Sequence, residues 1–283
     1  MRLSLIFTFL SYEIKRAVAR KKVLVLVAFL LLLDTLPYFA LQHSASSLVP
    51  PELYPYVWVA GILIPQPLFM QFIAIFIAAG AMSEEYEQGT AELLMSKPVS
   101  KMEYVIGKFA GGYVLLLMIL LLNSVVSLLS AYVTFGPQTA LGVLPGAYLV
   151  SAYAAMLFYS LSFMMGELLR RSSLAYIFAS ATLFTSEIIG FYMTLIYNLT
   201  WNEFYRAAEI YLPTSPVSSL PSQYVISGLP STAQALFRLL PLGGGETAAP
   251  ALTSALLILA YSLGSAVVFL LYFRYADISR KVS

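Results

Sequence analysis

Cysteine is absent from this 283-residue chain, and histidine occurs once, at His43. Without thiols there can be no disulfide, no cysteine-ligated zinc site and no thiol nucleophile. A single histidine also excludes a metal site built from several imidazoles. Charged residues make up 11% of the sequence, whereas a soluble domain has roughly 25%. The chain therefore has too few charges to cover a surface that faces water.

Apolar residues dominate instead, at 60% of the chain, with a mean hydropathy of +0.82. Only α-helices and closed barrels can cross lipid, because every backbone polar group needs an internal partner there. The apolar runs are continuous and do not alternate with polar residues, which favours helices over a barrel. The sequence predicts an all-α integral membrane protein that crosses the lipid bilayer of the cell membrane several times.

Six apolar segments are long enough to cross roughly 30 Å of hydrocarbon. They are expected at about Val23–Leu41, Val57–Met82, Tyr104–Phe135, Gly146–Leu169, Leu174–Leu199 and Ala251–Phe273. Ahead of them, residues 1–22 place Leu3, Phe7 and Leu10 on one helical face and end in a basic cluster. This pattern predicts an amphipathic helix that lies in the membrane interface.

Basic residues set the expected orientation. If the N-terminus is inside, one side of the membrane holds nearly all Lys and Arg, and the other holds only Arg206 and Arg238. Because cytoplasmic loops carry the excess of basic residues, both termini are expected in the cytoplasm. Residues 200–250 are then an outer loop. Its proline and glycine clusters, such as Leu212–Pro221, predict chain breaks, with a short amphipathic helix at Thr232–Leu240 between them.

The stretch Ser83–Lys108 is the densely charged interruption between two apolar runs. Gly89 is expected to end the helix of the second span, and Thr90 can cap a new one. Ala91–Lys97 then forms a short helix that Pro98 ends.

After this short helix, Ser100 and Glu103 fit a capping box, so Ser100 is expected to begin the third long helix. The short helix would expose Leu93, Leu94 and Met95 outside the membrane. Such a patch meets either a partner protein or the lipid interface, and the residues alone leave both open.

The same stretch resembles the signature of ABC type-2 transporter permeases. The matching run is Glu87-x-Gly89-Thr90-x-Glu92-Leu93-Leu94-x-x-x-Pro98-Val99-Ser100-x-x-Glu103-x-x-x-Gly107-Lys108. Lys101 stands where the family often has arginine. The six spans, the amphipathic N-terminal helix and Ser215-Pro216 before the last span are similar to the family in outline.

This resemblance implies one permease domain over 1–283, the membrane subunit of an ATP-driven exporter. Residues 1–22 would be its elbow helix, 83–103 a cytoplasmic coupling segment, and 200–250 an extracellular loop. The short coupling helix between spans two and three would seat in a groove of a nucleotide-binding subunit. The residues implied at that interface are Gly89, Thr90, Glu92, Leu93, Leu94, Met95, Lys97 and Pro98.

The sequence contains no Gly-x-x-x-x-Gly-Lys-Ser/Thr phosphate loop, so the chain is expected to have no ATPase site and no cofactor of its own. An ABC ATP-binding subunit would hold ATP and Mg. Six spans imply a permease homodimer, or a heterodimer with a related permease, and no nucleic-acid partner is expected. An acidic residue beside the coupling helix is expected to pair with a basic residue of the N-terminal helix. The candidates are Glu84, Glu85 and Glu87 on one side and Lys15, Arg16 and Arg20 on the other.

Two acidic residues fall inside predicted spans: Asp34 in the first and Glu187 in the fifth. A charge at mid-membrane costs about 3 kcal/mol on insertion scales, so such groups face a cavity or a partner. They either line a substrate pathway or hydrogen-bond between helices as protonated carboxyls. They also support an alternative function, an ATP-independent secondary transporter or channel that uses them as proton or ion sites. The sequence does not identify the substrate.

Overall fold

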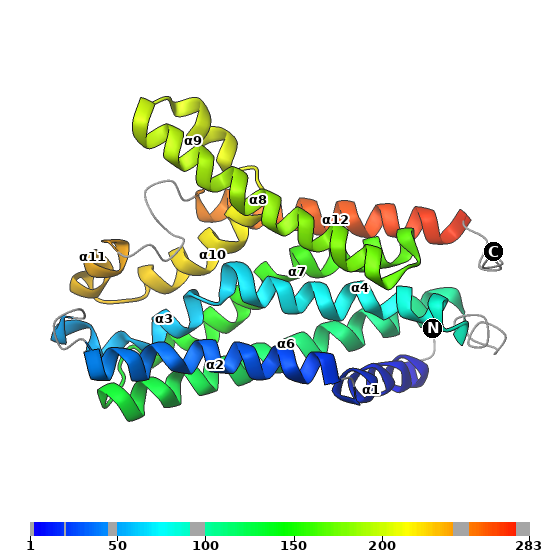
Figure 1. Ribbon diagram of the computed structural model, residues 1–283, viewed down its shortest axis with the longest axis horizontal. Helices are drawn as coiled ribbons and strands as arrows, with labels where there is room; N and C mark the ends of the chain where they lie inside the picture. Colours follow the sequence, from blue (N-terminus) through cyan, green and yellow to red (C-terminus); the bar gives the residue numbers. More distant parts are fainter. Residues whose placement is uncertain (1–2, 20, 45–49, 91–99, 240–248, 276–283) are drawn as a thin grey trace.

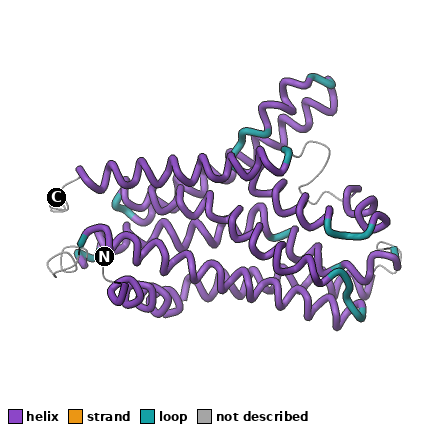
Figure 2. Tube along the Cα trace, turned by 180° about the vertical axis from the view of Figure 1, so that it is seen from behind, coloured by secondary structure: helices purple, strands orange, loops and turns teal. Residues whose placement is uncertain are grey.

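A computed structural model describes residues 3–19, 21–44, 50–90, 100–239 and 249–275. Long helices lie side by side along the longest axis, and the described ranges contain no strand (Figures 1 and 2). In chain order the elements are α1 (Leu3–Ala19), α2 (Lys21–Ser44), η1 (Pro51–Tyr56), α3 (Trp58–Leu63), η2 (Gln66–Met70), α4 (Gln71–Glu87), α6 (Lys101–Phe135), η3 (Leu141–Val143), α7 (Leu144–Leu169), α8 (Ser172–Thr200), α9 (Glu203–Glu209), α10 (Thr214–Ser227), α11 (Ser231–Leu239) and α12 (Ala251–Tyr275).

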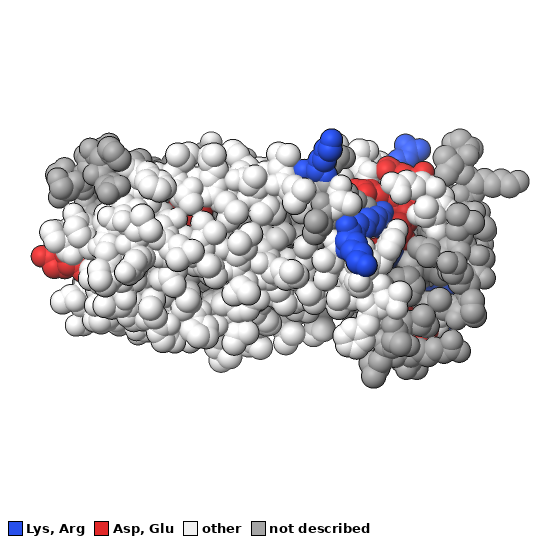
Figure 3. Space-filling view, turned by 90° about the horizontal axis from the view of Figure 1, so that it is seen from below, with Lys and Arg blue, Asp and Glu red and all other residues white. Residues whose placement is uncertain are grey.

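Five helical stretches are long and apolar enough to cross a membrane. They are Trp58–Glu87, Lys101–Phe135, Leu141–Leu169, Ser172–Thr200 and Ala251–Arg274. The first predicted span lies within α2, where the apolar stretch Val23–Phe39 is shorter. On the face shown in Figure 3, charged side chains gather toward one end, and the long middle is almost free of them. The chain is therefore a multi-pass helical membrane protein.

The second predicted span, expected as one run over Val57–Met82, corresponds to the helical stretch Trp58–Glu87 and contains a π-helical turn in its middle. α3 ends at Leu63, and the chain passes Pro65 into the wider π-helical turn η2 before α4 begins. Pro65 and Pro67 each lack a backbone N–H, so a regular helix cannot continue through them. The amide of Met70 instead donates to the Pro65 carbonyl at 3.0 Å, a reach of five residues.

α7 lies at the centre of the bundle and packs against α4, α8, α10 and α12. Its backbone comes close to that of α4 at Gly166, where an added Cβ would lie 2.5 Å from the Ala79 carbonyl oxygen. Small residues let membrane helices approach this closely. α1 lies at the same end of the bundle as the C-terminal end of α12 and packs against α6 (Figure 1).

Residues 200–250 were expected to form a loop with proline breaks, and the described part is instead largely helical. α10 runs through Pro216 and Pro221 and buries Val217 and Val225 against the bundle. Pro216 lies in the first turn, where a backbone donor is not needed. Around Pro221, serine hydroxyls donate to backbone carbonyls; Ser222 Oγ reaches the Ser218 carbonyl at 2.9 Å. α11 confirms the expected short helix near Thr232–Leu240.

The two ends of the charged stretch form as the sequence predicts. α4 ends at Glu87, and Gly89 takes the left-handed conformation with φ of 66°, which favours glycine. At the other end the Ser100 hydroxyl accepts from the Glu103 amide at 3.2 Å, and the Glu103 carboxylate accepts from the Ser100 amide at 3.2 Å. This capping box confirms the predicted start of α6.

We expect Ser100→Ala to destabilise the protein by about 1 kcal/mol, because the first turn of α6 loses its side-chain acceptor. Denaturant unfolding of the purified protein in detergent measures the loss. Ser100→Thr keeps a hydroxyl at the cap and is the matched control. Equal stability of the alanine variant and the control would show that the cap contributes nothing.

Candidate functional site

The last turn of α4 contacts four other helices through four consecutive residues. We call Glu84–Glu87 the α4 hub. Its side chains reach α1, α6, α7 and the first residue of α8. Segment 91–99, which lies outside the described residues, follows the hub in sequence and directly precedes the cap of α6. The hub therefore fixes the helix that leads into the predicted coupling segment.

Lys108 of α6 is the buried centre of the hub's ionic contacts. Its side chain is fully buried, and Nζ donates to Glu13 Oε1 at 2.7 Å, Glu85 Oε1 at 2.5 Å and the Ala81 carbonyl at 3.0 Å. An ammonium has three N–H donors, so each has an acceptor. The contacts join α1, α4 and α6. Burial of these charges is tolerated because each is paired and hydrogen-bonded.

Arg16 completes the charge balance of this cluster. Its guanidinium lies 2.7 Å from Glu85 Oε1, 3.5 Å from Glu13 and 3.8 Å from Glu84. The Tyr104 hydroxyl donates to the second oxygen of Glu85. Lys108 and Arg16 thus face Glu13 and Glu85 at close range, with Glu84 farther from Arg16, in a place with little exposure to solvent.

Tyr86 connects the hub to α7. Its hydroxyl lies 2.8 and 3.0 Å from the two carboxylate oxygens of Glu167. Arg170, just after α7, lies 3.4 Å from Glu167 and stacks over the Tyr86 ring at 4.7 Å and over the Tyr272 ring of α12 at 5.7 Å. These contacts tie the ends of α4, α7 and α12 together.

The two remaining glutamates of the hub bind α8. Glu84 accepts a hydrogen bond of 2.7 Å from the Tyr176 hydroxyl. Glu87 accepts from the amide and hydroxyl of Ser172 at 2.8 and 2.6 Å. Ser172 begins α8, so the carboxylate of Glu87 satisfies a free amide and stabilises the positive end of the helix dipole.

The two intramembrane acids lie in separate surroundings. Asp34 is buried where α2 packs against α3 and α6, close to Gly61. Glu187 is half-buried on α8, near enough to Glu209 of α9 for the two carboxylates to repel each other. At Glu209 burial raises the pKa, and a 2.9 Å hydrogen bond from Thr194 and the charge of Arg206 lower it.

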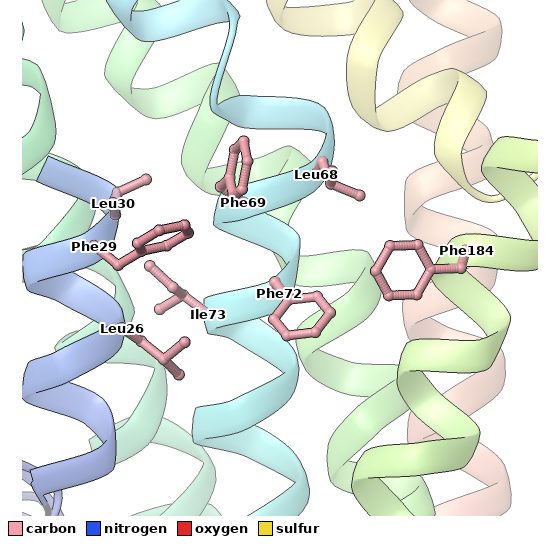
Figure 4. Close-up of a pocket in the computed structure, with 8 residues that line it drawn as sticks. All are labelled: Leu26, Phe29, Leu30, Leu68, Phe69, Phe72, Ile73 and Phe184. Atoms are coloured by element: carbon pink, nitrogen blue, oxygen red, sulfur yellow. The ribbon is translucent and has the colours of Figure 1, made fainter. Parts of the chain in front are cut away.

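An apolar cavity of about 170 Å³ lies between α2, the η2–α4 stretch and α8 (Figure 4). Its lining residues are Leu26, Phe29, Leu30, Leu68, Phe69, Phe72, Ile73 and Phe184. Phe184 lies one turn before Glu187 on α8. The cavity offers no polar side chain from these residues, so it suits an apolar group.

Residues 8–278 match the family described as ABC-2 family transporter protein. The chain belongs to the ABC-2 transporter family. A curated protein is also similar, the uncharacterized protein YhcI of Bacillus subtilis (strain 168), at 28% identity over 120 residues. That match covers 36% of this chain and 38% of YhcI. As a family member, the chain is a membrane component of an ABC transporter.

In this ABC-2 family member, the expected pairing of the N-terminal helix with the acidic residues after span two forms between Arg16 and Glu85. Lys15 is exposed, and Glu87 contacts α8. Thr90 Oγ1 lies 3.4 Å from the Glu85 carbonyl. The predicted interface residues Glu92, Leu93, Leu94, Met95, Lys97 and Pro98 lie outside the described residues, so their role stays a prediction.

The sequence did not predict which distant residues form ion pairs and hydrogen bonds around the α4 hub. Glu13, Tyr104, Glu167 and Arg170 were not expected at the site. Lys108 was noted only as part of the family signature, although a lysine inside an apolar run is itself a signal, because a lone charge there needs a partner. The sequence alone does not show which carboxylate forms an ion pair with Lys108.

Proposed function

We propose that this chain is the permease subunit of an ABC exporter, with six spans, both termini in the cytoplasm and hydrolysis of ATP with Mg on a separate ATP-binding subunit. Family membership and the α4 hub support this proposal. The observation that carries it is that the hub joins α4 to α1, α6, α7 and α8 immediately before the predicted coupling segment.

The geometry suits the transmission of force from segment 91–99. Its N-terminal side is attached to the hub, and its C-terminal side continues into α6 through the Ser100 cap. Lys108 binds both α1 and α4 from within α6, so the two sides of the segment are also joined to each other. A push on the segment would therefore move these helices together rather than bend one of them.

We propose that the substrate path runs beside α2, α4 and α8, where the apolar cavity lies, and that Glu187 lines it one turn from Phe184. The path would then suit a substrate with a substantial apolar part. A second permease copy, identical or related, would supply the opposite wall, as six spans per subunit imply.

Leu93→Asp/Leu94→Asp tests the coupling role. The variant, co-expressed with its ABC ATP-binding subunit, should fail to co-purify with that subunit or should lose transport-coupled ATP hydrolysis. A charged pair cannot be buried in an apolar groove without a partner. ATP hydrolysis and transport are measured in proteoliposomes.

The matched control is Leu93→Met/Leu94→Met, which keeps apolar side chains of similar size and should retain coupling. A fully coupled aspartate variant would contradict the role of this segment. Transport that proceeds without ATP and without the partner would instead favour the alternative function, a secondary transporter or channel.

A further inference from the structure

Asp34 is a buried carboxyl group without a hydrogen-bond partner among the described residues. The residue is 3% exposed, and neither Oδ1 nor Oδ2 has a partner among the described residues. It lies on α2 and faces Gly61 of α3, whose added Cβ would come within 2.7 Å of Asp34 Oδ1. An unpaired acceptor in such a place is unfavourable, and an unpaired ionised carboxylate much more so.

The hydroxyls near Asp34 already have acceptors elsewhere. Ser127 Oγ of α6 donates to the Trp58 carbonyl at 3.1 Å. Tyr38 OH lies 2.8 Å from Ser127 Oγ and 3.4 Å from the Val57 carbonyl. Because each hydroxyl has one hydrogen, this arrangement leaves none for Asp34.

Gly61 is the point at which these groups converge. A Cβ added there would collide with the Ser127 and Tyr38 oxygens and come close to Asp34. Asn123 of α6 reaches the Gly61 carbonyl with Nδ2 at 3.5 Å, and its own Oδ1 has no described partner. The site therefore gathers oxygen acceptors from three helices, and no donor among the described residues, Asn123 Nδ2 included, is hydrogen-bonded to Asp34.

Among the described residues, no positive charge is shown to face Asp34 from the elements packed against it. α3 and the Asn123–Ala131 stretch of α6 contain no charged residue. Tyr38, on α2 itself, is the titratable neighbour. With neither a cation nor a hydrogen-bond donor bound to Asp34, the packed helices accommodate the neutral carboxylic acid and disfavour the carboxylate.

We propose that Asp34 is a proton-binding site that holds its proton while α2 is packed against α3 and α6. When α2 separates from them, water reaches the carboxyl, the O–H bond breaks, and the proton passes to water and leaves a carboxylate. Low pH thus favours the packed arrangement, and rising pH favours separation. The site itself does not depend on an ATP-binding partner, so its failure and that of the proposed function can be told apart.

Infrared spectroscopy of the full chain in lipid tests the proposal, because protonated and ionised carboxyls absorb at different frequencies. The difference between wild type and Asp34→Asn isolates the Asp34 bands. We expect the protonated band at neutral pH. Glu187→Gln, which changes a half-buried acid on α8, is the matched control and should leave these bands in place.

Ser127→Ala provides a second test that does not remove the carboxyl. It takes away the nearer acceptor of Tyr38 OH and leaves only the Val57 carbonyl at 3.4 Å, so that hydroxyl can turn to donate to Asp34 and stabilise the carboxylate. The Asp34 titration should then move to lower pH than in wild type. A carboxylate band at neutral pH in the wild type would overturn the proposal, and so would a protonated band that disappears on adding Na⁺ at constant pH.

Discussion

Lys108→Met should destabilise the protein by about 3–5 kcal/mol, the loss expected when one partner of a buried ion pair is removed. The variant leaves Glu13 and Glu85 buried without the ammonium that both now contact. Arg16 alone cannot balance two carboxylates. We expect α1 to detach from α6, which should raise proteolysis within residues 3–19. Thermal unfolding in detergent and limited proteolysis measure the two effects.

Lys101→Met is the matched control, because Lys101 lies on the same helix and is exposed. It should change stability by less than about 1 kcal/mol, as surface charges do. The double variant Lys108→Met/Glu85→Gln removes one charge of each sign and leaves Glu13 with Arg16. It should be more stable than Lys108→Met alone. If the double variant is the less stable of the two, the charge-balance explanation is wrong.

Gly166→Val should separate α4 from α7 and destabilise the protein by about 1–3 kcal/mol or more, as overpacking of a tight contact does. The added Cβ meets the Ala79 carbonyl oxygen at 2.5 Å. A backbone atom within a helix cannot move aside as a flexible side chain can. The strain acts one residue from Glu167, so the hydrogen bond between Tyr86 and Glu167 should weaken too.

Gly264→Val on α12 is the control, because an added Cβ there meets no heavy atom within 4 Å. Both substitutions place a β-branched residue inside a helix, so the difference in unfolding midpoint reports the α4–α7 contact. Equal midpoints would mean that α4 and α7 can move apart without loss.

Sequence patterns predicted the long helices because a long, continuous apolar run in lipid forms an α-helix, which pairs all its backbone polar groups internally. The capping box at Ser100 and the break at Gly89 were predictable because both depend on neighbouring residues. The hub was only partly predictable. Lys108 and Glu13 are 95 residues apart in the sequence, and nothing local selects that pair over others.

Two prolines affect their helices differently, and the sequence around each one does not predict which effect it has. Pro65 precedes a π-helical turn in the second span, whereas Pro221 lies inside the regular helix α10. The helix around Pro221 is held by tertiary packing, because Val217 and Val225 are buried against the bundle. Tertiary packing therefore decides whether the helix continues at each proline, and the positions of prolines in the sequence do not reveal that packing.

The burial of the hub has a consequence for ionic strength. Salt screens charges that are separated by water, with a Debye length of about 8 Å in physiological salt, and acts weakly on buried pairs. Lys108 and Glu85 have at most 1% of their side chains exposed. The buried ion pairs that connect α1, α4 and α6 should therefore persist in concentrated salt. Contacts that depend on exposed charges such as Lys15 should weaken. A salt titration would thus separate the permease's internal rigidity from its attachment to a partner.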